Sequence, residues 1–266
     1  MLRKLIKYDF IDFTRRMLPM YAAVFVLFII AAIFMPTNPK MMEKGFVGIA
    51  GFIFIMLIIM SIIAMSVITL INIILRFHHN LLGNEGYLSH VLPVKPIDHY
   101  SSKLVVSVLF SIFTILVAII SAIVMGIILL VKTGNANSLD SIITLCKDIF
   151  KVTLVNHTVL TVLYFISLFI STINSVEMVF LSMLLGYQHR NKKVIMSFVY
   201  YVLLYFASNI FELLVGVALG FNIFAIKNGG FFYKNTLINS IISNIIIAVG
   251  FFIWSNYLLD KKLNLE

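Results

Sequence analysis

The sequence predicts an all-α integral membrane protein with six transmembrane helices. Hydrophobic residues make up 61% of the chain and charged residues only 12%, and the mean hydropathy of +1.06 far exceeds that of water-soluble domains. Two runs, 46–75 and 104–131, contain no charged residue, and each is longer than the roughly 20 residues that cross a bilayer's hydrocarbon. No stretch of soluble-domain size remains, so residues 1–266 are predicted to form a single transmembrane domain.

An amphipathic interfacial helix is expected over residues 1–17. At 100° per residue most of its apolar side chains share one face and most of its basic side chains lie opposite, although Asp9 falls on the apolar face. The segment is therefore predicted to lie in the headgroup layer and to turn into the first span at Pro19. Two roles stay open for it, a membrane anchor or a lever that touches a cytoplasmic partner.

Turn and loop signals separate the six predicted spans, which are residues 18–35, 46–75, 104–131, 157–185, 194–226 and 237–259. With a cytoplasmic N-terminus, the inner segments hold 13 of the 20 Lys and Arg residues and the outer segments hold 7. This excess predicts a multi-pass protein of the cell membrane with both termini cytoplasmic. The net charge of +9 then reflects topology and contact with anionic membrane lipids, and it gives no reason to expect nucleic acid as a partner.

The loop 76–103, between the second and third spans, carries the most ordered signals of the chain. Asn84 can cap a short helix, and Pro93 ends it. Pro96 can open the next helix, which leads into the third span. Four residues of the short helix form one apolar stripe, namely Tyr87, Leu88, Val91 and Leu92. Such a face fits a groove on another protein, and the alternative is that it lies flat on lipid headgroups.

The segment N-E-G-Y-L-x-x-x-L-P-V, residues 84–94, resembles the loop between spans two and three in permeases of ABC exporters, in the type-2 drug, antibiotic and peptide export class. The resemblance implies a coupling helix that sits in a cleft of a separate ATPase subunit. By position, the implied contact residues are Glu85, Gly86, Tyr87, Leu88, Leu92 and Pro93. It also implies that two permease chains pair, that two ATPase copies bind ATP and Mg, and that spans two and five line the route.

The chain has no G-x-x-x-x-G-K-[ST] phosphate loop and no soluble segment to hold one. We therefore expect no enzymatic activity and no cofactor in this chain, and ATP hydrolysis belongs to the partner. Four histidines lie in or beside the loop 76–103, namely His78, His79, His90 and His99, but they lack the spacing of metal ligands, so no metal site is predicted.

Polar residues inside the spans give a second group of candidates. In the fifth span Asn209, Glu212, Gly216 and Gly220 share a face, and the two glycines form a G-x-x-x-G that permits close helix packing. Glu177 interrupts the fourth span. These residues indicate either a polar substrate path or helix packing. A polar stripe in the fourth span comprises Ser167, Ser171, Asn174, Ser175 and Ser182, and interhelical hydrogen bonds are the favoured interpretation for it.

Three functions follow from these features. The first is the permease subunit of an ATP-driven exporter for an amphipathic or lipophilic substrate, such as a drug, a lipid or an antimicrobial peptide, in which case the chain serves antimicrobial peptide resistance. The second is a proton-coupled secondary carrier that uses Glu177 and Glu212. The third is a non-transporting membrane scaffold or sensor.

Overall fold

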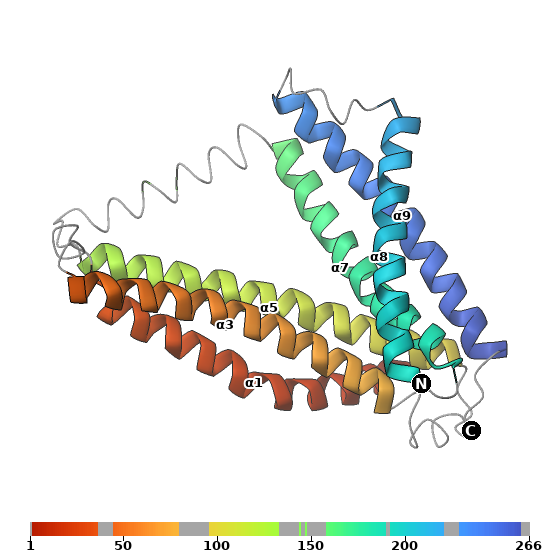
Figure 1. The fold of residues 1–266 in the computed structure, drawn as a ribbon, viewed down its shortest axis with the longest axis horizontal. Helices are drawn as coiled ribbons and strands as arrows, with labels where there is room; N and C mark the ends of the chain where they lie inside the picture. Colours follow the sequence, from red (N-terminus) through yellow and green to blue (C-terminus); the bar gives the residue numbers. More distant parts are fainter. Residues whose placement is uncertain are drawn as a thin grey trace. The chain divides into compact units, whose positions relative to one another are not determined.

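The computed structural model describes residues 2–36, 45–79, 96–132, 158–189, 192–220 and 229–261, together with Thr144 and Lys147. Within these residues the chain forms the helices α1 (Leu2–Phe34), α3 (Gly45–Phe77), α5 (Pro96–Lys132), α7 (Thr158–Gly186), α8 (Lys193–Ala218) and α9 (Gly229–Lys261) (Figure 1). All six are long and apolar enough to cross a membrane. The predicted all-α class and the six spans are confirmed at this level.

Two helix ends differ from the sequence prediction. Helix α1 runs without interruption through Pro19, where we expected an interfacial helix to turn into the first span. A proline removes one backbone donor but is tolerated in membrane helices, where local adjustments satisfy the freed groups. Helix α8 ends at Ala218, well before the predicted residue 226, and the chain turns there because Gly220 adopts the left-handed conformation with φ +69°.

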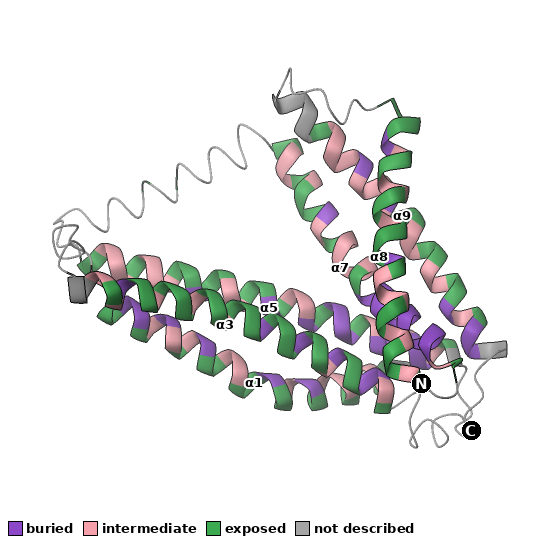
Figure 2. Ribbon diagram, viewed as in Figure 1, coloured by how far each residue is buried: buried purple, intermediate pink, exposed green. Residues whose placement is uncertain are grey.

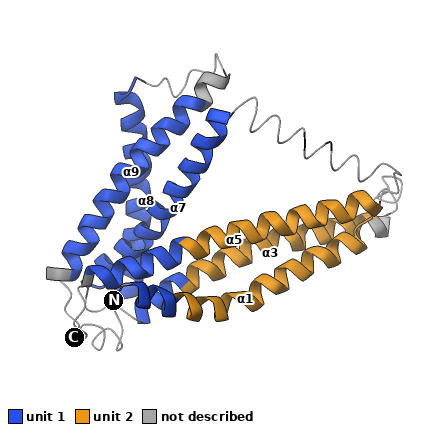
Figure 3. Ribbon diagram, turned by 180° about the vertical axis from the view of Figure 1, so that it is seen from behind, with its two compact units in different colours: residues 1–9, 73–108, 157–266 blue, residues 10–72, 109–156 orange. Residues whose placement is uncertain are grey.

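The described chain divides into two compact units (Figure 3). Unit 1 comprises residues 1–9, 73–108 and 157–266, and unit 2 comprises residues 10–72 and 109–156. Helices α1, α3 and α5 contribute residues to both units, whereas α7, α8 and α9 belong to unit 1 alone. Each unit is therefore described by its own contacts.

Unit 2 is a three-helix assembly with a small apolar core. Val24 and Phe28 of α1 and Met65 of α3 are buried, and Val117 and Met125 of α5 pack against them. These side chains gain van der Waals contacts when they pack against one another. Such packing drives helix association in lipid.

Polar contacts fix how the helices of unit 2 pair. The Tyr21 hydroxyl lies 2.9 Å from Thr114 Oγ1, which lies 3.1 Å from Thr69 Oγ1, so one hydroxyl of each helix joins a shared network. At one end, Lys132 Nζ donates to the carbonyl oxygens of Ile33 (2.6 Å) and Met35 (2.7 Å). This ammonium satisfies carbonyls that the end of α1 leaves without helical partners.

Unit 1 is built around α7, which packs against both α8 and α9. The second half of α7 is its most buried stretch, and Phe180 and Leu181 are fully buried there. Between α7 and α9, Asn174 Nδ2 donates to Asn244 Oδ1 at 2.6 Å. Between α9 and α8, Asn239 Nδ2 donates to the Glu212 backbone oxygen at 3.1 Å. These two bonds fix the register of the three helices.

Exposed residues occur along the helices of both units (Figure 2), and many of them are large apolar residues. Phe165 of α7 is 63% exposed and Phe198 of α8 is 69% exposed. Exposed apolar side chains over whole helix lengths are unfavourable in water but suit contact with lipid tails. The exposure pattern thus agrees with a multi-pass membrane protein.

We predict that Gly186→Ala destabilises unit 1 by about 1–3 kcal/mol, the usual cost of overpacking. A Cβ at this position, where α7 ends, would lie 2.6 Å from the Cα of Ser197, and backbone cannot move aside cheaply. Thermal unfolding of the purified chain in detergent measures the effect. The matched control is Gly250→Ala in α9, where a Cβ meets nothing within 4 Å and should raise helix stability. Equal melting temperatures of the two variants would contradict the prediction.

Candidate functional site

The predicted coupling residues of the loop 76–103 lie outside the described residues; they are Glu85, Gly86, Tyr87, Leu88, Leu92 and Pro93. The structure describes both ends of that loop, where α3 ends and α5 begins. We call residues 73–79 and 96–103 the loop base. Both segments belong to unit 1, so their contacts with each other and with α7 and α9 are defined. Helix α5 begins at Pro96, as the sequence predicted.

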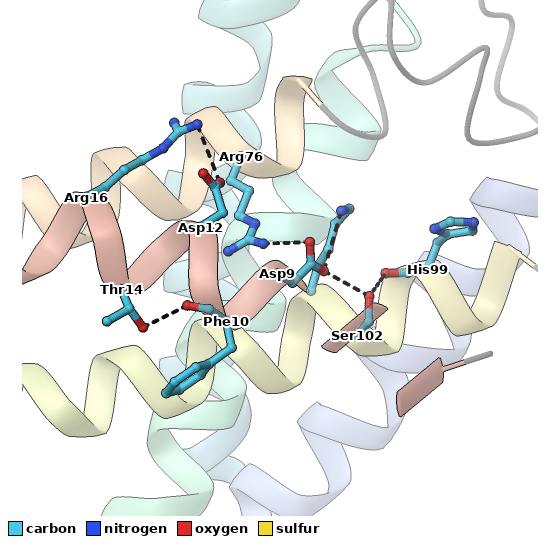
Figure 4. A network of polar contacts seen from close by, with 9 residues as sticks. Asp9, Phe10, Asp12, Thr14, Arg16, Arg76, His99 and Ser102 are labelled. Carbon is cyan, nitrogen blue, oxygen red and sulfur yellow. Dashed lines mark hydrogen bonds and ion pairs between the residues drawn. The ribbon is translucent and has the colours of Figure 1, made fainter. Parts of the chain in front are cut away.

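One carboxylate joins the two sides of the loop base (Figure 4). Arg76 Nη2, in the last turn of α3, donates to Asp9 Oδ1 at 2.5 Å. On the α5 side, Ser102 Oγ donates to Asp9 Oδ2 at 3.2 Å, and Lys103 Nζ lies 3.8 Å from the same oxygen. Asp9 itself belongs to α1, so this cluster of four residues ties three helices together.

The cluster is shielded from solvent, and this burial determines how much the loss of one partner destabilises the protein. The side chains of Arg76 and Asp9 are 7% and 14% exposed, and that of Lys103 is 6% exposed. By contrast, the ion pair between Asp12 and Arg16 lies on the surface, with side chains 49% and 59% exposed. Surface pairs contribute little to stability, whereas removing one partner of a buried pair leaves a charge with no compensation.

Sequence reasoning missed this cluster, although one signal pointed to it. Asp9 is the residue that falls on the apolar face of the predicted amphipathic helix. A carboxylate on a face that packs against other helices needs a cationic partner, because burying it alone is costly. Periodicity within one segment cannot show that Arg76 and Lys103 approach a residue more than 60 positions earlier in the chain.

An aromatic cluster connects the loop base to α7 and α9. The ring of Phe77 stacks on that of Phe180 of α7, with centroids 4.1 Å apart. The ring of Tyr100, from the first turns of α5, lies 5.8 Å from Phe180 and 5.7 Å from Phe252 of α9. Such ring pairs add to the stability that burial alone provides. A displacement of either side of the loop base therefore displaces rings that are packed on two further helices.

Beside the loop base lies a group of basic and aromatic side chains. The His78 ring is 5.4 Å from the ring of Tyr187, and Lys193 Nζ lies 5.4 Å from the Tyr187 centroid. Burial lowers the pKa of His78, and the neighbouring His79 and Lys193 lower it further. Burial raises the pKa of Tyr187. Among the described residues, no group of three or more His, Cys, Asp or Glu side chains is placed to hold a metal ion.

The two acidic residues of the spans occupy different surroundings. Glu177 of α7 is buried, whereas Glu212 of α8 is only partly buried. Glu212 sits level with Asn239, and Glu177 lies one turn beyond the level of Asn174 and Asn244. At 1.5 Å of rise per residue, the two carboxyl groups are about 12 Å apart along the bundle. The structure does not bring them into one site.

The other predicted candidates of the fifth span also have different surroundings from one another. Asn209 is exposed, and its amide donates to the Tyr205 backbone oxygen of its own helix at 2.7 Å. Gly216 is buried within α8. Gly220 lies beyond the end of α8, and a Cβ there would meet nothing within 4 Å. Its role is the left-handed turn, so the predicted close packing through both glycines does not extend to Gly220.

The interhelical hydrogen bonds expected of the polar stripe on α7 form at Asn174 but not at its four serines. The hydroxyls of Ser167, Ser171, Ser175 and Ser182 each donate to the backbone oxygen three residues earlier in α7. Serine in a helix satisfies its hydroxyl locally because that carbonyl is always within reach. The bond between α7 and α9 comes instead from Asn174, whose longer side chain reaches Asn244.

Comparisons of the chain with protein-family models, with curated proteins and with solved structures give no match. The functional argument therefore depends on the residues themselves and on the geometry described above.

We predict that Asp9→Asn lowers the stability of the chain by roughly 3–5 kcal/mol, because Arg76 and Lys103 stay buried without the carboxylate that neutralises them. Asp12→Asn is the matched control on the same helix and should cost about 0.5 kcal/mol or less, since its partner is solvated. Thermal unfolding of both variants in detergent measures the difference. The buried cluster would lose its assigned importance if the two variants unfolded at the same temperature.

We also predict that Lys193→Gln raises the pKa of His78, because it removes a positive charge that disfavours the imidazolium. Since the folded-state pKa lies below the unfolded value of about 6.5, the unfolded chain binds the proton first, and stability falls as pH drops through that value. Histidine NMR titration of the purified chain measures the shift. Lys192→Gln is the control, and an equal shift in both variants would argue against a specific effect of Lys193.

Proposed function

We propose that this chain is the transmembrane permease subunit of an ATP-driven ABC exporter. The motif Glu-Gly-Tyr-Leu…Leu-Pro in the loop 76–103 provides the family resemblance. The loop base supplies the physical support: both of its sides are tied to Asp9, and both pack on Phe180 of α7. A force applied to such a loop moves a set of packed helices, which is what a coupling element requires.

In this proposal the loop points into the cytoplasm of the cell that carries the chain in its membrane, and both termini lie on the same side. Two ATPase subunits bind ATP and Mg, and each grips the coupling helix of one permease chain, either two identical chains or two homologous ones. Closure of the ATPases draws the coupling helices together. Packed helices with two discrete arrangements then convert that movement into opening toward the other side of the membrane.

The close packing of the loop base against α7 and α9 determines how much of this movement is transmitted. The interior of a packed protein has low compressibility, so displacement of Phe77 or Tyr100 is passed to Phe180 and Phe252 and is not absorbed locally. The substrate is proposed to be amphipathic or lipophilic, an antimicrobial peptide, drug or lipid, in keeping with the Phe- and Met-rich composition of the spans. This chain contributes positioning and movement, and the ATPase contributes the chemistry.

We predict that Tyr87→Asp combined with Leu88→Asp abolishes ATP hydrolysis that co-purifies with the full-length chain, because two carboxylates replace the apolar face that fills the ATPase cleft. The measurement is nucleotide hydrolysis by the affinity-purified complex from native membranes. The matched control is Asn80→Asp combined with Ser89→Asp, which adds the same charge away from that face.

Hydrolysis that survives in the Tyr87 and Leu88 variant, or that never accompanies the wild-type chain, would refute the exporter assignment. The carrier alternative has a separate signature, which is substrate movement in vesicles with a proton gradient and no ATP. The scaffold alternative requires that no substrate moves under either condition. The wide separation of Glu177 and Glu212 weakens the version of the carrier in which both carboxyl groups serve one site.

A further inference from the structure

Glu177 is a buried carboxyl group without a cationic partner. Its side chain lies in the most buried stretch of α7 and is 3% exposed. Its Oε2 atom has no hydrogen-bond partner, and none of the ion pairs of the described residues includes it. An ionisable residue retained at such a place in a membrane helix is costly, and the usual reason for it is a function.

Two hydroxyl groups share its surroundings. The Tyr100 ring of α5 packs against Phe180, one turn after Glu177 on α7, and against Phe252, one turn before Ser255 on α9. Tyr100 and Ser255 are both fully buried. Neither hydroxyl group has a hydrogen-bond partner among the described residues. Three helices thus place three oxygen atoms with unused hydrogen-bonding capacity in one buried region.

The hydrogen bonding of these three groups is incomplete. An ionised carboxylate can only accept hydrogen bonds, and each hydroxyl can donate one, yet neither donates in this packing. A proton on Oε2 changes the balance, because it removes a negative charge that no hydrogen bond to Oε2 and no ion pair compensates among the described residues. The neutral acid is the form that the apolar surroundings favour.

We propose that Glu177, with Tyr100 and Ser255, forms a proton-binding site inside unit 1. The carboxyl group holds its proton while α5, α7 and α9 are packed together, and it releases the proton when these helices separate and water reaches Oε2. No covalent bond forms or breaks other than the O–H bond of the acid. The site does not include Glu212, and it does not depend on the exporter assignment.

None of the ion pairs among the described side chains of the neighbouring elements includes Glu177. On α5, Lys103 forms an ion pair with Asp9, and His99, which precedes Tyr100, is buried. On α3, Arg76 is also bound to Asp9. Helix α9 contributes the uncharged Ser255. On α8 the titratable groups are Lys193, three tyrosines and Glu212. Lys193 lies over the Tyr187 ring, and Glu212 lies at a different depth from Glu177.

Infrared difference spectroscopy of the full chain in lipid nanodiscs tests the proposal, because a neutral carboxyl group has a C=O stretching band that a carboxylate lacks. At neutral pH we expect one such band from a carboxyl shielded from water. Glu177→Gln should remove it, and the matched control Glu212→Gln should leave it in place. Raising the pH should make the band disappear in the wild-type chain.

Two further variants keep the test decisive if Glu177→Gln does not fold. Tyr100→Phe and Ser255→Ala each remove a polar hydroxyl group from the surroundings of the acid, and at least one should shift the frequency of the same band. The proposal is overturned if no shielded neutral carboxyl band exists at neutral pH, if the band persists in Glu177→Gln, or if it ignores both hydroxyl variants. None of these outcomes bears on ATP hydrolysis, so the exporter assignment is tested separately.

Discussion

The carboxylate of Asp9 is the interaction on which the organisation of unit 1 depends. It is the anion that faces two buried cations, Arg76 and Lys103, from two different helices. Charges placed in a region of low dielectric interact strongly, and those two cations would repel each other without the carboxylate between them. The beginning of α1 therefore helps to hold the end of α3 beside the start of α5.

This constraint explains why the aromatic contacts at the loop base are possible. Phe77 follows Arg76 directly, and Tyr100 precedes Ser102 by half a helical turn, so fixing the polar residues also fixes the direction of both rings. Both rings then meet Phe180 of α7. The polar cluster fixes the positions of Phe77 and Tyr100, and the contacts of these two rings with Phe180 connect the loop base to α7. The two described ends of the loop are therefore fixed to one another and to α1, α7 and α9.

The sequence was sufficient for the class and the number of spans because hydropathy over some 20 residues is a strong, local signal. It was weaker at helix ends: α8 stops at Ala218 because Gly220 can adopt a positive φ, and apolar residues beyond that point mask the stop. It missed the cluster around Asp9 because the partners are distant in sequence. The one local indication was that Asp9 falls on an apolar face. This position predicts that the carboxylate needs a partner, but it does not identify the partner.

Asp9 and Glu177 show how one chemical group takes two roles within the same unit. Asp9 is surrounded by donors and cations that satisfy its negative form, so its charge is a fixed part of the packing. Glu177 is buried, its Oε2 atom accepts no hydrogen bond, and none of the ion pairs of the described residues includes it. Tyr100 lies between the two environments, since its ring contacts Phe77 and also Phe180, one turn after Glu177. The two carboxyl groups therefore place opposite demands on the packing of unit 1, because Asp9 is stabilised by nearby cations as an anion, whereas the apolar surroundings of Glu177 favour its neutral form.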